Sequence, residues 1–386
     1  MAASTPLASP PVAYVRSTPA AVLPAPATMT GLIGWVRANL FSSPANTVLT
    51  LASALLAAWV LPGMISFLIT DAVWSGADRE ACIAKNGVLP GACWAFVKER
   101  ISFFIYGFYP IDQRWRVDVF FFLGAIGVAW MLWLHAPRRD VGMVFFLIVL
   151  PLASYWLLAG NSWLGLSAVD TAKWGGLMVT LVVAGVGIVA SLPLGILLAL
   201  GRRSKMPVVK FFSVLFIEFV RGVPLITVLF MANTMLPLFL PDNVTVDKLL
   251  RALVGIGLFA SAYMAEVVRA GLQALPKGQY EGAMAVGLGY WQMMRLIVLP
   301  QALKITIPNI VNTYIGLFKD TSLLLIVGIF DFLKAIETAR IDPQWAAPTV
   351  SSTGYAFAAI VYFVFCYGMA RYARAMEQRL SAGDKR

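Results

Sequence analysis

Long apolar runs alternate with short polar segments along most of the chain. Runs of about 20 apolar residues, the length that a helix needs to cross about 30 Å of hydrocarbon, recur along the sequence. Because a helix satisfies its own backbone hydrogen bonds in lipid, these runs predict spanning helices and an all-α fold. About eight spans are expected, at 47–70, 118–136, 141–160, 174–200, 211–240, 248–268, 307–330 and 353–374.

Composition and charge support a polytopic membrane protein. Of the 386 residues, 60% are hydrophobic and 13% are charged, a balance that soluble domains do not reach. The net charge of +11 first indicates orientation, because Lys and Arg gather on the cytoplasmic side of a bilayer. The basic residues between the spans fall on one side if both termini are cytoplasmic. A nucleic-acid partner is disfavoured, because no basic stretch carries interleaved aromatic residues.

The polar segments divide the chain into blocks. Residues 1–30, rich in Pro, Ala, Ser and Thr, predict a disordered cytoplasmic tail. Residues 31–160 predict an N-terminal block with an interfacial helix, three spans and an outer cap loop at 71–117. Residues 174–380 predict a five-helix core with a cytoplasmic loop at 268–306.

Two of the three cysteines lie in the outer cap loop. Cys82 and Cys93 face an oxidising compartment in this topology, so they either form a disulfide or stay as two reduced, buried thiols. Cys366, in the last span, is expected to serve packing.

The cytoplasmic loop contains a short stretch of small residues, "QYEGAMAVGLG" at 279–289. It predicts a two-turn helix that Gly287 and Gly289 can end in a left-handed conformation. Small side chains such as Ala283 allow another chain to approach closely, and Glu281 can present a charge to a partner. The alternative is an ordinary loop whose small residues serve internal packing.

A second helix is expected to follow, from Tyr290 to Leu299, where Pro300 stops it. It offers an apolar face on which the first helix can rest. That face consists of Trp291, Met294, Ile297 and Val298.

This loop resembles the cytoplasmic signature of the amino-acid permease subunits of ATP-binding-cassette (ABC) importers. The signature reads Glu-Ala-Ala, then Gly, then Leu-Pro after a further helix. This chain matches it in register at Glu281, Gly282, Ala283, Gly287, Leu299 and Pro300. Gly282 departs from the usual Ala, which weakens the helix by about 0.5 to 1 kcal/mol and keeps its surface small.

Other segments extend the resemblance over about 174–380. They are "GGLMVTLVVAGVGIVASLPLGILLAL" at 175–200, "FIEFVRGVPLITVLF" at 216–230 and "NTYIGLFKDTSLL" at 312–324. The N-terminal block, with "GFYPIDQRWRVD" at 107–118, looks like the larger, M-type permease subunits of general L-amino-acid importers.

The resemblance implies a permease subunit of a type I importer for polar or general L-amino acids in the bacterial inner membrane, with both termini cytoplasmic. It implies that the short helix is the coupling helix, which transmits ATP-driven closure of a partner ATPase into alternating access. The implied partners are a homologous second permease in a heterodimer, two copies of the ABC ATPase and a periplasmic amino-acid-binding protein.

The sequence shows no catalytic or metal-binding pattern of its own. It has no Ser-His-Asp candidate, no metal-ligand cluster and no Gly-rich phosphate loop. We therefore expect a transporter subunit that is not an enzyme and holds no cofactor or metal, with ATP and Mg bound by the partner ATPase.

Charged residues inside the expected spans mark candidate transport residues. Lys319 and Asp320 fall about 16 Å into the seventh span, near the midplane, where charges cost several kcal/mol unless paired or hydrated. With Thr321 and Ser322 they either line the translocation path or form a structural ion pair between helices. An ion-coupled secondary transporter or channel would use the same charges, whereas a membrane scaffold would leave them unexplained.

The fifth span carries a second polar group. Glu218 and Arg221 stand three residues apart just before Pro224, so they can pair on one helical face at a bend or gate hinge. Asn233 and Thr180 are further candidates for the path, and both could equally bond backbone carbonyls.

Overall fold

The computed structural model describes residues 31–383 apart from 84–88, 134–137 and 242. This part of the chain is helical and contains no β-strand, only three isolated β-bridges, so the all-α prediction is confirmed. The chain divides into two compact units, Met1–Ser66 and Phe67–Arg386. The tail expected at 1–30 lies outside the described residues.

The first unit holds α1 (Gly31–Asn39) and α2 (Pro44–Ile65). Ser43 caps α2 by accepting a 3.2 Å hydrogen bond from the backbone N–H of Asn46, and Pro44 occupies the first turn, where its missing N–H costs little. Leu32 and Trp35 of α1 are exposed.

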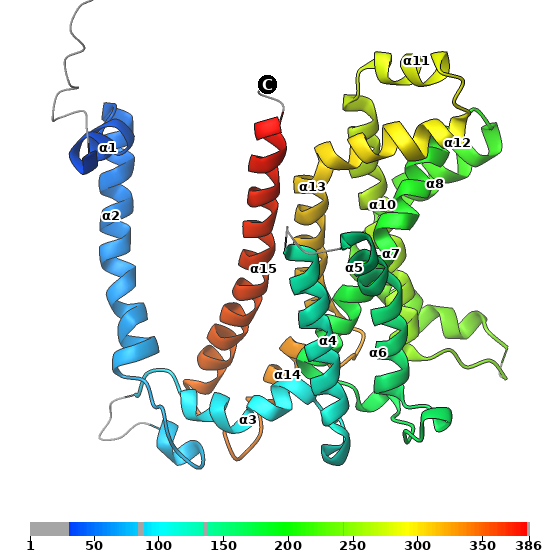
Figure 1. Cartoon of the computed structure of the whole chain (residues 1–386). Helices are drawn as coiled ribbons and strands as arrows, with labels where there is room; N and C mark the ends of the chain where they lie inside the picture. The colour runs from blue at the N-terminus through cyan, green and yellow to red at the C-terminus, as the bar shows by residue number, and fades with distance from the viewer. Residues whose placement is uncertain (1–30, 84–88, 134–137, 242, 384–386) are drawn as a thin grey trace, which may run out of the picture. The chain divides into compact units, whose positions relative to one another are not determined.

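The second unit is a bundle of helices (Figure 1). Its helices are α3 (Trp94–Tyr106), α4 (Trp115–Leu132), α5 (Arg139–Val144), α6 (Leu150–Ala159), α7 (Gly176–Arg202), α8 (Pro207–Gly222), α9 (Leu225–Phe230), α10 (Lys248–Ala274), α11 (Lys277–Ala285), α12 (Tyr290–Met293), α13 (Leu299–Asp320), α14 (Phe332–Ala339) and α15 (Val350–Gly383). In Figure 1, α11 and α12 lie at one end of this unit, and α3 and α14 at the other.

Five helices in the described part of the chain are long and apolar enough to span a bilayer, and the pair α8 and α9 makes a sixth if it forms one bent span. The expected spans at 118–136 and 141–160 coincide with α4 and with the shorter apolar helix Phe145–Ala159.

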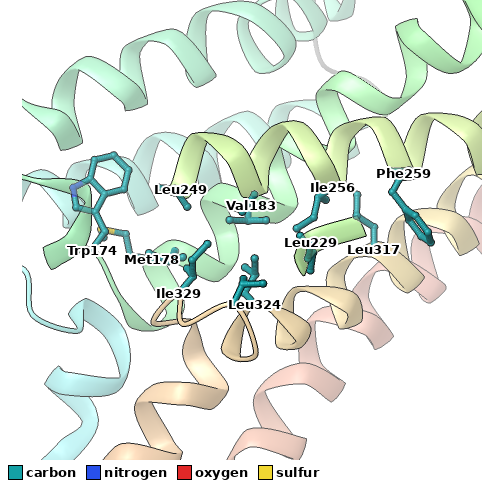
Figure 2. Close-up of a cluster of buried hydrophobic side chains, with 14 of the residues drawn as sticks. Trp174, Met178, Val183, Leu229, Leu249, Ile256, Phe259, Leu317, Leu324 and Ile329 are labelled. Carbon is teal, nitrogen blue, oxygen red and sulfur yellow. The ribbon is translucent and has the colours of Figure 1, made fainter. Parts of the chain in front are cut away.

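Helices α7, α10 and α13 form the core, and glycines bring them close together. A Cβ atom at Gly195 would lie 2.7 Å from Cβ of Met264, and one at Gly271 would lie 2.6 Å from the carbonyl oxygen of Ala302. Small residues are the usual means of close helix packing in membranes. Figure 2 shows the buried cluster that also joins these helices, with Val183 of α7, Ile256 of α10 and Leu317 of α13.

A bend of 105° separates α8 from the apolar segment that starts at Leu225. Val223 has extended dihedrals, with φ −109° and ψ 136°, because the ring of Pro224 disfavours a helical residue before it. The chain therefore turns sharply at the Pro224 position.

Pro300 does not stop the second cytoplasmic helix, contrary to the prediction. Helix α12 continues through a π-helical turn, Met294–Val298, into α13, and Pro300 lies in the first turn of α13. The π turn lets the helix pass the proline, whose missing N–H is tolerated in a first turn. Lys319 and Asp320 consequently stand at the C-terminal end of α13.

The outer cap is bound to the C-terminal helices. A disulfide joins Cys82 to Cys93, and the backbone N–H of Cys93 donates a 2.8 Å hydrogen bond to Oγ1 of Thr353 in α15. Arg100 of α3 forms an ion pair with Asp342, which follows α14. The segment at 71–117 is therefore packed against the core.

Candidate coupling and transport site

Helix α11 ends where the sequence predicts. Gly287 has φ +78° and donates a 3.0 Å hydrogen bond to the carbonyl of Met284, a left-handed helix end that glycine adopts without strain. Gly289, expected to share this role, has φ −68° and instead precedes α12. There its N–H donates to the side-chain oxygen of Gln292 at 3.2 Å, which fixes the start of the second helix.

Helix α11 has one buried and one exposed face. Ala283 is only 2% exposed and packs in a cluster with Met294 and Val298. Glu281 and Gly282 are exposed, and a Cβ atom at Gly282 would meet no atom within 4 Å. A partner protein can therefore lie directly against the helix backbone beside the Glu281 carboxylate.

Large apolar side chains extend this exposed face. Met284 is 58% exposed, Val286 is 73% exposed and Trp291 is 68% exposed. Of the four residues expected to support α11, Met294, Ile297 and Val298 pack in the cluster with Ala283, whereas Trp291 lies outside that cluster and is exposed. Exposed apolar residues grouped in this way are typical of a protein-binding surface.

Tyr280 anchors α11 to the core. Its hydroxyl donates a 2.9 Å hydrogen bond to the carbonyl of Leu272 near the end of α10. Arg203, which directly follows α7, donates a 3.1 Å hydrogen bond to the same hydroxyl, and its guanidinium lies 5.6 Å from the ring centroid. Sequence reasoning missed this anchor, because a basic residue between two spans indicates only the orientation of the chain.

Five charged side chains from α7, α8 and α10 form what we name the Glu266 cluster, namely Arg202, Glu218, Arg221, Glu266 and Arg269. Glu266 lies at its centre, with Oε1 2.8 Å from Nη1 of Arg202 and Oε2 2.8 Å from Nη2 of Arg269. Arg202 also binds Glu218 at 2.7 Å. The cluster ties three helices together near the end that carries α11.

The expected pair between Glu218 and Arg221 is not formed. Glu218 binds Arg202 of α7, and Nη1 of Arg221 lies 3.9 Å from Oε2 of Glu266 in α10. The guanidinium of Arg221 also lies 5.7 Å from the ring centroid of Tyr263. Partners on neighbouring helices replace the local pair, because a long Arg side chain reaches across a helix–helix contact as easily as along its own helix.

A cavity of about 650 Å³, which we name the bend cavity, lies between the Pro224 bend and the end of α13. Its lining includes Arg221 at the end of α8 and Pro224 at the bend. Tyr263 of α10, and Thr313 and Asp320 of α13, also line it. The structure thus brings a cation and a carboxylate from separate helices to one space, together with the hinge residue.

Lys319 is exposed and does not line the bend cavity. Four other candidates for the path do not line it either, and each forms a hydrogen bond with a backbone group. Thr321 is fully buried and donates to the carbonyl of Phe318 at 2.7 Å, and Ser322 donates to that of Lys319 at 2.8 Å. Thr180 accepts a 3.0 Å bond from the N–H of Phe332, and Asn233 donates to the carbonyl of Leu229 at 3.3 Å.

Comparison with known proteins places this site in a family. The family described as "Binding-protein-dependent transport system inner membrane component" matches residues 191–382. The "Inner membrane amino-acid ABC transporter permease protein YhdY" of Escherichia coli (strain K12) is 50% identical over 349 residues, which cover 90% of this chain and 93% of that protein. The chain belongs to this family of transport-system membrane components.

Two further similarities accompany that match. The "Glutamate/glutamine/aspartate/asparagine transport system permease protein BztC" of Rhodobacter capsulatus is 40% identical to this permease, over 95% of this chain and 98% of that protein. A structure titled "Crystal structure of an amino acid ABC transporter with histidines" aligns with a TM-score of 0.46 and 25% identity, over 53% of this chain and 92% of that one.

The permease is an inner-membrane ABC transporter subunit and not itself an enzyme, because the relatives that match nearly its whole length are permease subunits. In the part of the permease that the structure describes, no group of three or more His, Cys, Asp or Glu residues could hold a metal ion. The Glu266 cluster, like the Tyr280 anchor, is a feature that sequence reasoning missed. Its signal was the spacing of Glu266 and Arg269, which lie one helical turn apart in a span.

Proposed function

We propose that this permease is the transmembrane subunit of an ATP-driven importer for polar L-amino acids. The exposed face of α11 carries the proposal, because it presents Glu281 and bare backbone at Gly282 while Ala283 fixes the opposite face to the core. This arrangement suits a coupling helix that docks into a groove of a partner ATPase. The matching relatives, named as amino-acid ABC transporter permeases, support amino acids as cargo.

The anchor of α11 suggests how closure of the ATPase reaches the membrane. Arg203 and the carbonyl of Leu272 hold Tyr280 at the ends of α7 and α10, so a displacement of α11 pulls on both helices together. Both helices also meet α8 in the Glu266 cluster, because Arg202 of α7 binds Glu218 and Glu266 of α10 lies 3.9 Å from Arg221. We infer that movement of α11 shifts α8 and the Pro224 bend, and thereby opens and closes the path.

The bend cavity suits part of that path. A free amino acid carries a carboxylate and an ammonium group, and the cavity lining offers Arg221 and Asp320 on different helices. Charge-assisted hydrogen bonds to both ends of such a molecule would fix its orientation. Pro224 borders the same space, so a change in the bend angle would change access to it.

The proposed assembly contains this permease, a homologous second permease, two copies of an ABC ATPase and a periplasmic amino-acid-binding protein. Both termini of the permease are cytoplasmic in this proposal, with the disulfide-bonded cap outside. The N-terminal block lies at the periphery of the permease pair. ATP and Mg are bound by the ATPase.

Uptake by the complete complex tests the proposal. The complex is reconstituted in liposomes with the binding protein outside, and uptake of a panel of radiolabelled amino acids is followed. We expect accumulation that requires ATP inside the vesicle and persists when proton and sodium gradients are abolished. Uptake that follows an ion gradient without ATP would contradict the proposal and indicate a secondary transporter.

The role of Asp320 is tested in the same assay. Asp320→Asn should reduce uptake about tenfold while the complex still assembles, because loss of one charge-assisted hydrogen bond is worth about 1.5 kcal/mol. Ser322→Ala is the matched control, since its hydroxyl only bonds the carbonyl of Lys319. Unchanged uptake by the Asp320→Asn complex would assign Asp320 to a structural role.

A further inference from the structure

A second cavity, of about 510 Å³, lies between α6 of the N-terminal block and the core helices α7 and α10. We name it the α6 cavity. None of its lining residues lines the bend cavity. Its walls are mostly apolar and include Leu150 and Leu158 of α6, Val186 and Val189 of α7, and Leu253 of α10. Its size falls within the range of small-molecule and cofactor sites.

The polarity of the α6 cavity is concentrated in two loop segments. Asp170 and Thr171 lie in the segment before α7, and Asp247 is the N-terminal cap of α10. The hydroxyl of Thr171 donates a hydrogen bond to Asp247, so these two segments meet at one end. No salt bridge within the described residues includes Asp170 or Asp247, and no Lys or Arg lines the cavity.

Trp174 provides an independent sign of a ligand. Its ring lines the α6 cavity and is only 4% exposed, yet its indole N–H has no acceptor in the described part of the chain. A buried Trp usually donates this hydrogen to a partner, because an unmade hydrogen bond is costly. Figure 2 shows the indole nitrogen on the side of the ring that faces away from the labelled core side chains.

We propose that the α6 cavity binds one phospholipid with an amine headgroup. The apolar walls hold an acyl chain, the carboxylates of Asp170 and Asp247 attract the ammonium group, and an ester or phosphate oxygen accepts the hydrogen bond of Trp174. The amphiphile matches the cavity in polarity, because both have one charged end and an apolar body. The lipid fills the space between the N-terminal block and the core, and so ties the two together.

The source of the ligand is the surrounding bilayer. The segments that carry Asp170 and Asp247 precede spans that run from the outside to the inside in the expected topology, so the headgroup lies at the outer surface. This inference requires only that the permease is embedded in a bilayer. It does not depend on the cargo or on coupling to ATP.

Filling the cavity is the first test. A Cβ atom at Gly185, which lines the α6 cavity, would meet no atom within 4 Å, so Gly185→Trp places a large ring in the empty space. Gly368→Trp on α15 is the matched control, because a Cβ atom there also meets nothing within 4 Å. Lipids that co-purify with the complete complex from mild detergent are counted by native mass spectrometry and identified after extraction.

We expect the wild-type and Gly368→Trp complexes to retain one phosphatidylethanolamine molecule per permease that the Gly185→Trp complex loses. Equal retention by all three would overturn the proposal. The proposal would also be overturned if the wild-type complex retained no phospholipid and a Gly185→Cys variant cross-linked to a partner subunit, which would assign the cavity to a protein contact.

The headgroup is tested with a double variant, Asp170→Asn with Asp247→Asn. Asn keeps the capping hydrogen bonds of both residues and removes their charge. In nanodiscs that contain equal amounts of phosphatidylethanolamine and phosphatidylglycerol, wild-type complex should retain the amine lipid in excess, and the variant should lose that preference. Trp174→Phe removes the indole N–H, keeps an aromatic side chain and should lower retention. An unchanged preference in the double variant would refute the headgroup assignment.

Discussion

Arg203 and Tyr280, 77 residues apart in the sequence, form a hydrogen-bonded and stacked pair at the base of α11. The hydroxyl of Tyr280 accepts from the guanidinium and donates to the carbonyl of Leu272, so one side chain joins the ends of α7 and α10 to the exposed helix. A coupling helix needs such an attachment, because force applied to an unattached surface helix would not reach the membrane.

Removing the Tyr280 hydroxyl should loosen this attachment. Tyr280→Phe deletes two hydrogen bonds, each worth about 1 kcal/mol, while the ring remains to stack on Arg203. We expect the complex to assemble normally and to transport several-fold fewer amino acids per ATP hydrolysed. Measuring uptake and hydrolysis in the same liposomes gives this ratio, with Tyr290→Phe on the exposed face as control. If the Tyr280→Phe complex transported as many amino acids per ATP hydrolysed as wild type, these hydrogen bonds would play no part in coupling α11 to the membrane helices.

Glu266 should be the most sensitive member of its cluster. Glu266→Gln leaves three arginines facing one another without their shared carboxylate, which is 16% exposed, and should destabilise the complex by about 3 kcal/mol. Glu218→Gln is the matched control, since its side chain is 54% exposed and should cost less than about 1 kcal/mol. Thermal unfolding of the purified complexes compares them, and equal shifts in Tm would show that Glu266 is not the centre of the cluster.

Asp331 should make the stability of the permease depend on pH. This residue caps α14, outside the spanning helices, and is fully buried. Burial raises the pKa of its carboxyl to about 7, although hydrogen bonds from the N–H groups of Lys334 and Leu333 oppose that rise. The folded state therefore keeps the proton at pH values where the unfolded chain has lost it. The contribution of the protonated Asp331 to the stability of the fold is therefore complete below the ordinary pKa of an aspartic acid. It is lost as the pH rises through the folded-state pKa of about 7.

Asp331→Asn removes this titration and can still cap the helix. The free energy of unfolding of wild type should fall, relative to the variant, by about 3 kcal/mol between pH 5 and pH 7.5. Chemical unfolding of both proteins at the two pH values measures the difference. If the free energies of unfolding of wild type and Asp331→Asn differed by the same amount at pH 5 and pH 7.5, Asp331 would be ionised at both pH values.

The sequence predicts the parts of this molecule that depend on local patterning. The apolar runs predict helices, and Gly287 supplies the left-handed end of α11. The bend is also local, since Pro224 forces the residue before it out of a helical conformation. Each of these features follows from the chemistry of a few neighbouring residues.

Features that depend on tertiary contacts were not predictable in the same way. The predicted stop at Pro300 failed because a π turn just before it lets the helix continue. The predicted pair of Glu218 and Arg221 failed because Arg202 and Glu266, on other helices, offer closer partners. The Arg203–Tyr280 anchor could not be seen either, because nothing in the sequence shows that the two residues meet.

The central claim is that α11 couples a partner ATPase to the permease through its exposed face. ATP hydrolysis by the complex in lipid, with and without loaded binding protein, tests this claim most directly when wild type is compared with Glu281→Lys. Glu377→Lys on α15 is the control, an exposed carboxylate outside α11. We predict that Glu281→Lys abolishes the stimulation by loaded binding protein and weakens retention of the ATPase, while Glu377→Lys behaves as wild type. Full stimulation and normal retention in the Glu281→Lys complex would contradict the account.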